Sequence, residues 1–433
     1  MKKMLTLVLM ATSGLAAWAA PTAPKAAGPK RLIVSFKPGA TAAQRAQALK
    51  SLGAKTLAVI KSNGTSNDEF EAMLVESSAS GPVAKPLAPK AGFRNDIFGN
   101  AASGGSFTAA EEMVTVEEDV RVQWIESAAP SFQAAPLPSF SGVMSGVPRF
   151  QHNAAVSGEI PWGVRRVKAP AAWDTTEGKG VMVAVIDTGI KANHPELDGQ
   201  VVGGYSAIDD SEAYESWQDD NGHGTHVAGT IAAKRDGKGV VGVAPKAKLY
   251  GVKVLDADGS GNLSDVIKGI IWAANNNIQV ANMSLGSPMP SETMHRALRY
   301  AKGRSMVVVA AAGNSGGSVG YPGAYPETIA VSAADYNDKL ADFSSRGAEV
   351  DFIAPGVDVV STWPNNNTVS LSGTSMAAPH VAGLAALAVA QGARGLGGPD
   401  GVMSALKKSA KTIGLTATEE GAGMPDAGRL TEQ

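Results

Sequence analysis

Three polar residues that could together perform nucleophilic catalysis stand far apart in the chain. Asp187 follows the apolar run 181–186 and precedes Thr188-Gly189. His223 lies between two glycines, and Ser375 precedes a long apolar stretch. A carboxylate can hold an imidazole in one tautomer, and that imidazole can take the proton of a serine hydroxyl that attacks a carbonyl carbon. The three residue types suit acyl transfer, provided that the fold brings them together.

Each of these residues also has an alternative interpretation when it is taken alone. A serine at the start of a helix is most often an N-cap, and a histidine between glycines is commonly structural. Asp-Thr-Gly also occurs in aspartic proteases, which need two carboxylates that share a proton. The chain has no second Asp-Thr-Gly or Asp-Ser-Gly, so an aspartic protease based on Asp187 would have to be a homodimer.

Apolar runs at 181–186, 249–255 and 306–312 predict the elements that position these residues. Continuous runs of this kind are typical of strands buried on both faces of a parallel sheet. Helical spacing over 263–274 and an all-apolar stretch over 381–390 alternate with them. The pattern predicts an α/β fold, a three-layer parallel sheet with helices on both faces. Asp187 would then lie at the carboxyl end of a strand, where such folds place their sites.

Taken together and in this order, the three sequences around Asp187, His223 and Ser375 closely resemble the subtilisin family of serine peptidases. The resemblance runs almost continuously from Pro161 to Ala427 and includes four further segments: Gly242-Val243-Ala244-Pro245, Ser284-Leu285-Gly286, Ala311-Ala312-Gly313-Asn314 and Tyr321-Pro322-Gly323-Ala324-Tyr325-Pro326. It implies a serine endopeptidase in which Ser375 attacks the scissile carbonyl, His223 moves the proton and Asp187 orients His223. It also implies that the Asn314 amide and the backbone N–H of the nucleophile form the oxyanion hole.

The resemblance also implies how a peptide substrate binds. The substrate pairs as an extended strand with two edge segments, which reads backbone groups and gives broad specificity. The matching edge residues are Gly259, Ser260, Gly261, Ser284, Leu285 and Gly286, and the matching primary pocket is lined by Ala311, Ala312 and Gly313 with Gly320 as its floor. These pocket residues carry no charge, so we expect large apolar or aromatic side chains before the cleaved bond. A catalytically dead relative that acts as a binding module is a further alternative, which the intact triad and Asn314 disfavour.

No cofactor is expected for the chemistry, but the family often binds structural Ca²⁺. The resemblance places Glu196 and Asp236 at such a site, although Lys234 and Arg235 depart from the family pattern, and the acidic stretch 209–220 is a second location that suits Ca²⁺. His226 stands three residues after His223 and could bind a metal with it. No third ligand follows in a known zinc pattern, so we interpret His226, like His194 and His380, as structural.

The chain before residue 159 divides into segments of different composition. In residues 1–19, two lysines precede an apolar run that ends in Ala17-Trp18-Ala19, which predicts a secretory signal peptide and a secreted, extracellular protein. The run is short for an uncleaved anchor, because a membrane span needs about 20 apolar residues. Residues 30–126 are predicted to form a small α+β domain that looks similar to the family's inhibitory propeptide, with a flexible insertion at 78–106. Residues 127–158 have linker composition and are expected to contain the processing site, before a catalytic domain at 159–433.

Composition sets limits on the function. The chain has 433 residues, 44% of them hydrophobic, a net charge of −2 and no cysteine. A chain with this hydrophobic content can bury a large core. Because it has no cysteine, disulfides and thiolate metal sites are excluded. Nucleic-acid binding needs a clustered basic face, and a chain with a net charge of −2 gives no sign of one. Nucleic acid is therefore not an expected partner. The expected partners are protein and peptide substrates and the chain's own propeptide. We expect a monomer that has no membrane contact after signal cleavage.

Overall fold

The computed structural model describes residues 29–63, 69–77, 114–125 and 159–432. The predicted signal peptide, the 78–106 insertion and the 127–158 linker lie outside these described residues.

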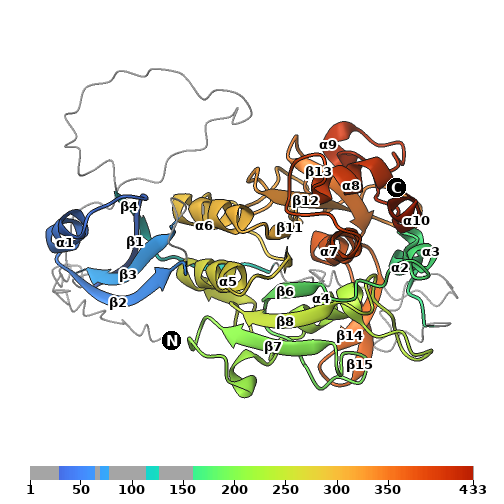
Figure 1. Ribbon diagram of the computed structural model, residues 1–433, viewed down its shortest axis with the longest axis horizontal. Helices are drawn as coiled ribbons and strands as arrows, with labels where there is room; N and C mark the ends of the chain where they lie inside the picture. The colour runs from blue at the N-terminus through green and yellow to red at the C-terminus, as the bar shows by residue number, and fades with distance from the viewer. Residues whose placement is uncertain (1–28, 64–68, 78–113, 126–158, 433) are drawn as a thin grey trace, which may run out of the picture.

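A seven-stranded sheet forms the centre of the larger part of the molecule (Figure 1). Its strands are β6 (Met182–Asp187), β7 (Val201–Ser206), β8 (Lys248–Lys253), β10 (Val280–Met283), β11 (Val307–Ala311), β12 (Thr328–Ala334) and β13 (Val350–Pro355). Their spatial order is β13-β12-β11-β10-β6-β8-β7, and every neighbouring pair is parallel. The order reverses beside β6, so Asp187 ends the strand at the point where α/β sheets open a binding crevice.

Helices cover both faces of this sheet. Alternate residues of β6 point into two separate cores: Val183 and Val185 pack with residues of α4 (His223–Ala232) and α7 (Thr374–Ala390). Ala184 and Ile186 pack with residues of α5 (Leu263–Asn275) and α6 (Glu292–Gly303). This alternation is what a strand buried on both sides requires. The predicted three-layer α/β fold is confirmed.

Helix α7 is buried from Thr374 to Val389 and packs on α4 and the central strands. Its apolar residues face every direction, as the sequence predicted, because neighbouring elements surround it. Its first turn carries Ser375 to the carboxyl edge of the sheet. The remaining elements around this core are α2 (Trp162–Arg166), α3 (Ala169–Ala172), the 3₁₀ turn η2 (Tyr214–Trp217), α8 (Val402–Ser409), α9 (Ala417–Glu420), α10 (Ala427–Thr431), and the hairpin of β14 (Val359–Trp363) with β15 (Asn367–Leu371).

A second, antiparallel sheet stands at the N-terminal end of the described chain. It contains β1 (Lys30–Phe36), β2 (Ala54–Lys61), β3 (Glu71–Ser77) and β4 (Val114–Glu118) in the order β2-β3-β1-β4, with α1 (Ala42–Ser51). The sheet lies against α5 and α6 (Figure 1), and its Ile33, Phe70 and Leu74 join the same core as α5. After this sheet, the short strand β5 (Arg121–Gln123) pairs antiparallel with β9 (Ser260–Asn262) of the larger part.

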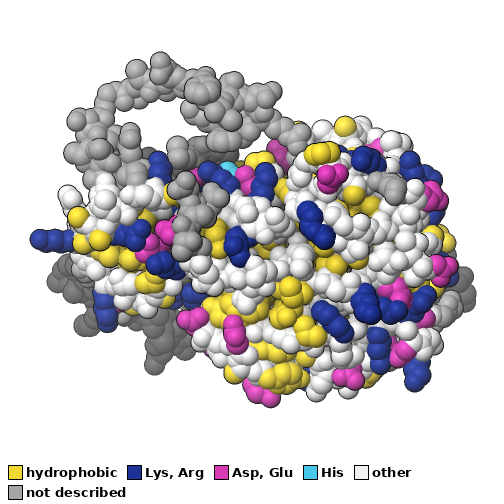
Figure 2. All heavy atoms as spheres, viewed as in Figure 1, with side chains coloured by type: hydrophobic (Ala, Val, Ile, Leu, Met, Phe, Trp, Pro, Cys, Tyr) yellow, Lys and Arg dark blue, Asp and Glu magenta, His cyan; other side chains and the backbone are white. Residues whose placement is uncertain are grey.

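The described helices include none that is both long and apolar enough to cross a bilayer. On the face drawn in Figure 2, basic and acidic side chains are interspersed rather than separated by sign.

Candidate active site

Asp187 and His223 are hydrogen-bonded to each other. Nδ1 of His223 lies 2.8 Å from Oδ1 and 3.0 Å from Oδ2 of Asp187, whose side chain is fully buried. The backbone N–H of Thr188 also donates to Oδ1, at 2.7 Å. The carboxylate therefore holds the proton on Nδ1 and leaves Nε2 as the ring nitrogen that can accept another.

Glycines on both sides of His223 allow neighbouring groups to approach closely. Gly222 has φ 119° and precedes α4, and a Cβ there would overlap the ring of Trp363. A Cβ on Gly224 would overlap the backbone oxygen of Gly189, which belongs to the loop after Asp187. The two glycines thus let the start of α4 lie directly against the end of β6.

Ser375 is the second residue of α7 and is held by a reciprocal pair of contacts with Ser284. The Ser375 hydroxyl donates to the backbone oxygen of Ser284 at 3.1 Å, and the Ser284 hydroxyl donates to the backbone oxygen of Ser375 at 2.7 Å. Asn282 Nδ2 in turn donates to the Ser284 hydroxyl at 2.9 Å. In this state the proton of the Ser375 hydroxyl points to Ser284 rather than to His223.

Asn314 follows β11 and presents one end of its amide to α7. Its Oδ1 accepts hydrogen bonds from the backbone N–H of Thr374 at 2.8 Å and from the Thr374 hydroxyl at 2.9 Å. Because both partners are donors, the oxygen is fixed on this side, and Nδ2 is the end left to donate elsewhere. The Thr374 hydroxyl accepts from the N–H of Gly313 at 3.1 Å, which ties the two loops together.

His223, Asn314 and Ser375 line one pocket of about 290 Å³. The imidazole, the hydroxyl and the free amide donor thus share one space, at the start of a helix whose N-terminal dipole favours negative charge. The hydrogen bond between Asp187 and His223 argues against the aspartic-protease alternative. In that class the carboxylate shares its proton with a second carboxylate, whereas the Asp187 carboxylate is engaged with an imidazole.

The pKa of His223 is raised above its ordinary value. Burial lowers it, but the charge of Asp187, the hydrogen bond to Asp187 and the charge of Asp219 together raise it by more. A base whose protonated form is stabilised in this way is suited to taking a proton from a hydroxyl.

The predicted edge segments hold a strand of this same chain. Gly259 O accepts from the N–H of Trp124 at 3.1 Å and from that of Ile125 at 3.3 Å, and Gly286 N–H donates to Trp124 O at 2.9 Å. Gln123 and Ile125 line the pocket that contains His223 and Ser375. Residues 121–125 therefore occupy the groove between the two edges and lead into the catalytic pocket.

The predicted primary-pocket residues lie beside Asn314, the predicted oxyanion-hole residue. Ala311 ends β11, and Gly320 N–H donates to Ala312 O at 2.9 Å, which brings the expected wall and floor together. Gly313 has φ 109° and connects this wall to Asn314. The structure gathers these residues, and their role in binding a side chain stays a prediction.

The two residues expected at a calcium site differ in how well they suit a cation. Glu196 is 9% exposed and its Oε2 is buried without a hydrogen-bond partner, while a Cβ on Gly239 would overlap its Oε1. Burial, and next the charge of Asp236, raises the pKa of Glu196 to about 6. Asp236 instead pairs with Lys234 at 3.1 Å and accepts from Lys238 N–H. Glu196 fits a cation, whereas Asp236 is already engaged.

The other candidate metal ligands have protein partners. His226 Nε2 lies 3.0 Å from Val359 O, and burial, then the neighbouring His223, lowers its pKa to about 3. His380 Nδ1 donates to Met376 O at 2.9 Å, and His194 Nε2 lies 3.2 Å from Asn367 O. Among the described residues, no three His, Cys, Asp or Glu side chains gather as a metal site, the 209–220 stretch included. The structural interpretation of these histidines agrees with their contacts.

The sequence analysis missed Thr374 and the hydroxyl of Ser284. Thr374 stands directly before Ser375, and its N–H and hydroxyl orient Asn314. Its position in Gly373-Thr374-Ser375 is a signal that could have marked it, because a hydroxyl beside a nucleophile can bind loop groups. The Ser284 hydroxyl gave no such signal, since the backbone oxygen to which it donates is 91 residues away.

Comparison with known proteins places this site within a recognised family. The model of the subtilase family matches residues 178–424, which include Asp187, His223, Asn314 and Ser375. M-protease of Shouchella clausii (strain KSM-K16) is 54% identical over 230 residues, 53% of this chain and 59% of that protein. Subtilisin Savinase of Lederbergia lenta is 54% identical over 230 residues, which cover 83% of it. The thermostable alkaline protease of Halalkalibacterium halodurans is 50% identical over 234 residues, 54% of this chain and 63% of that protein.

Proposed function

Because the chain belongs to the subtilase family of serine peptidases, we propose that it is a secreted serine endopeptidase that is made as a self-processing precursor. One observation carries the proposal: an imidazole held by a buried carboxylate lines the same pocket as a helix-start serine and an asparagine amide. No cofactor is needed for this chemistry, because proton transfer and charge stabilisation come from side chains and backbone.

In the proposed reaction, Ser375 Oγ attacks the carbonyl carbon of the scissile bond as His223 Nε2 takes the hydroxyl proton. The hydroxyl has to turn away from Ser284 O first, and catalytic contacts of this kind commonly tighten only when substrate binds. His223 then gives the proton to the leaving amine, and water hydrolyses the acyl-enzyme by the reverse steps. Asp187 holds the ring and stabilises its protonated form throughout.

Asn314 Nδ2 and the backbone N–H of Ser375 are the proposed donors to the oxyanion. The Oδ1 contacts with Thr374 fix the amide before the reaction, so no reorganisation is needed as negative charge develops. The start of α7 adds the positive end of its dipole at the same place.

The N-terminal part of the chain is proposed to inhibit the enzyme until it is removed. Strand β5 fills the groove between the two edge segments, which is the arrangement that strand addition gives a peptide substrate. Since residues 121–125 lead into the pocket, we place the processed bond within a few residues after Ile125, at the start of the 127–158 segment. N-terminal sequencing of the secreted protein, compared with a Ser375→Ala precursor, tests both the position and the self-cleavage.

The primary pocket is proposed to prefer large apolar or aromatic side chains. Ala311, Ala312, Gly313 and Gly320 offer a wall and floor without charge, and backbone pairing at the edges gives little further selection. Chromogenic peptides that differ only in the residue before the cleaved bond test this. Preferred cleavage after Lys or Glu would refute it.

A structural Ca²⁺ is also proposed, with Glu196 among its ligands. Ca²⁺ prefers oxygen ligands, and the buried Glu196 Oε2, which has no hydrogen-bond partner, offers one. The ion would stabilise the loop and take no part in the reaction.

The catalytic proposal is tested by a fluorophosphonate probe, which labels a serine only where that serine is activated. We expect the label on Ser375 in the processed protein and loss of peptide hydrolysis in Ser375→Ala. A processed protein that hydrolyses no peptide and takes no label would instead be a binding module.

A further inference from the structure

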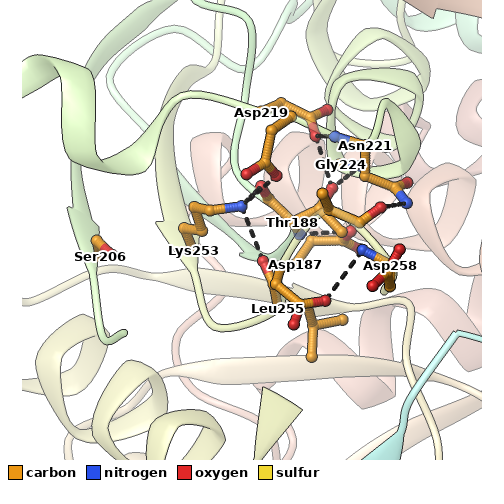
Figure 3. A network of polar contacts seen from close by, with 12 residues as sticks. Asp187, Thr188, Ser206, Asp219, Asn221, Gly224, Lys253, Leu255 and Asp258 are labelled. Carbon is orange, nitrogen blue, oxygen red and sulfur yellow. Dashed lines mark hydrogen bonds and ion pairs between the residues drawn. The ribbon is translucent and has the colours of Figure 1, made fainter. Parts of the chain in front are cut away.

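A second buried carboxylate, Asp219, accepts five hydrogen bonds from the segments that carry Asp187 and His223. Figure 3 shows it in one polar network with Asp187, Thr188 and Asn221. Its side chain belongs to the loop before α4, and the residue is 8% exposed. Oδ1 accepts from the Thr188 hydroxyl at 2.9 Å and from the N–H groups of Asn221 and Gly222 at 3.0 and 2.8 Å. Oδ2 accepts from the N–H and the hydroxyl of Thr225, at 2.9 and 2.5 Å.

The surroundings of Asp219 consist of donors, which favours the ionised form. The Thr188 hydroxyl accepts from Gly224 N–H at 3.0 Å, and the Thr225 hydroxyl accepts from Lys191 N–H at 2.9 Å. Because these lone pairs are in use, both hydroxyl hydrogens point to Asp219. Burial raises the pKa of Asp219, and hydrogen bonds from Thr225 and the adjacent loop oppose that rise.

These contacts connect the two segments that carry the catalytic pair. Thr188 directly follows Asp187 at the end of β6, while Gly222 and Thr225 flank His223 at the start of α4. One carboxylate therefore fastens the strand end to the helix start. Its negative charge also acts on His223 and favours the protonated ring.

We propose that Asp219 is a positioning residue for His223, which fixes the ring against Asp187 and adds negative charge that stabilises the imidazolium during peptide hydrolysis. The inference rests on the proposed function. It assigns a role to a residue that touches neither substrate nor the reacting atoms.

Other charged groups also surround the imidazole and bear on its pH dependence. Asp187 faces it from β6, and His226, held neutral by burial, lies one helical turn away on α4. Asp258 lines the same pocket. Lys253 of β8 lies behind the strand end, where its ammonium donates to Thr188 O at 2.8 Å and pairs with Asp220 at 2.6 Å. Asp220 is the matched comparison: it is the next residue, its carboxylate is 54% exposed, and its charge is balanced by Lys253.

The test compares Asp219→Asn with Asp220→Asn in the full chain, after each has been processed. We expect kcat to fall roughly 100-fold for Asp219→Asn, because a small displacement of a catalytic group has an effect of that order, while KM stays near the wild-type value. Losing the charge lowers the His223 pKa, so the acidic limb of the kcat/KM profile moves to lower pH. Asp220→Asn should keep both the kcat and the acidic limb of the wild type.

A second pair of variants keeps the charge and changes only the connection. Thr188→Val removes the hydroxyl with little change of volume, and Thr188→Ser keeps it. We expect Thr188→Val to lower kcat with the acidic limb unmoved, and Thr188→Ser to retain activity. Melting temperatures in the Ser375→Ala background report on folding without any need for processing, so this pair still tests the proposal if Asp219→Asn does not fold.

The outcomes separate this inference from the function on which it rests. Wild-type protein that takes no fluorophosphonate at Ser375 contradicts the proposed function. If the wild type is labelled and Asp219→Asn is labelled at the same rate, the positioning role is contradicted but the proposed function is not. A fall in activity with an unmoved acidic limb in Asp219→Asn contradicts the role of its charge.

Discussion

Glu117 of the N-terminal sheet accepts a hydrogen bond from the hydroxyl of Ser291, the N-cap of α6, at 2.8 Å. The N–H groups of Glu292 and Thr293 donate to the same carboxylate at 2.7 and 3.2 Å. An acidic side chain at this end of a helix satisfies free N–H groups and meets the positive end of the dipole. The N-terminal sheet is thereby attached to the surface of the larger part.

Asp119 makes the equivalent contact with α5. Its carboxylate accepts from the N–H and hydroxyl of Ser264 at 2.8 and 3.0 Å, and Arg31 pairs with it at 2.9 Å. Two acids, separated by one residue, thus bind the starts of two neighbouring helices. Strand β5, which we propose to be inhibitory, follows directly, so these contacts fix where that strand meets β9.

The first prediction is that Glu117→Gln releases the N-terminal part sooner after processing. A neutral amide is a weaker acceptor than a carboxylate, and the difference of about 1 kcal/mol or more corresponds to roughly fivefold weaker binding. Glu118→Gln is the control, because Glu118 is exposed on the same strand. The measurement is the time course of activity as the full chain matures. Equal time courses for the two variants would show that the cap does not hold the inhibitor.

The second prediction separates the two ends of the Asn314 amide. Asn314→Asp keeps an oxygen for Thr374 but replaces the Nδ2 donor, so we expect kcat to fall by about 100-fold or more, the size of the loss for such a donor in another subtilase. The melting temperature should stay close to the wild-type value. Asn314→Ala loses both ends and should melt earlier than Asn314→Asp. Full turnover in Asn314→Asp would show that Nδ2 is not a donor in the oxyanion hole.

Much of the catalytic core could be predicted because its signals are local. The apolar run 181–186 predicted β6, and the all-apolar stretch 381–390 predicted the second half of α7, since burial on every side leaves no polar face. Asp187 directly follows the first of these stretches in the sequence, and Ser375 precedes the second. The parallel order of the strands then follows from the alternation of strand and helix.

What could not be predicted depends on contacts between distant segments. Glu117 and Ser291 are 174 residues apart, and nothing in either local sequence says that one sheet will dock on α6. The sequence showed Asp219 only as part of an acidic stretch, because an acidic residue in a solvated loop and a buried, hydrogen-bonded one cannot be told apart by residue type. The Ser375 hydroxyl bond to Ser284 O is a matter of side-chain rotation, which sequence does not encode.

The third prediction concerns Glu196 and calcium. Its folded-state pKa of about 6 lies above the ordinary value of 4.5, so without a cation this group favours folding most below about pH 4.5 and disfavours it as the pH rises through 6. A bound Ca²⁺ would compensate the carboxylate charge. We expect chelator to lower the melting temperature of the wild type at pH 8 and calcium to restore it.

Two variants identify the ligand in that experiment. Glu196→Gln should lose the response to calcium and, in chelator at pH 8, melt above the wild type, because no buried charge remains. Asp236→Asn should keep the calcium response, since its carboxylate is engaged by Lys234. A wild-type melting temperature that does not change with chelator would contradict the calcium site. Loss of the calcium response in Asp236→Asn would show that Asp236 is also a ligand.

The fourth prediction is that Gly222→Ala impairs both stability and catalysis. Gly222 has φ 119°, and the added Cβ would overlap the ring of Trp363, so the start of α4 and His223 with it must shift. Gly199→Ala is the control: its φ is 74°, and nothing lies within 4 Å of the added Cβ. Both positions have a positive φ that strains a residue with a Cβ, but only Gly222 adds an overlap with a neighbouring side chain. We expect Gly222→Ala to melt at a lower temperature than Gly199→Ala and to lose kcat, whereas Gly199→Ala keeps the kcat of the wild type. Matching kcat values in the two variants would mean that the ring of His223 is positioned without the close approach that Gly222 permits.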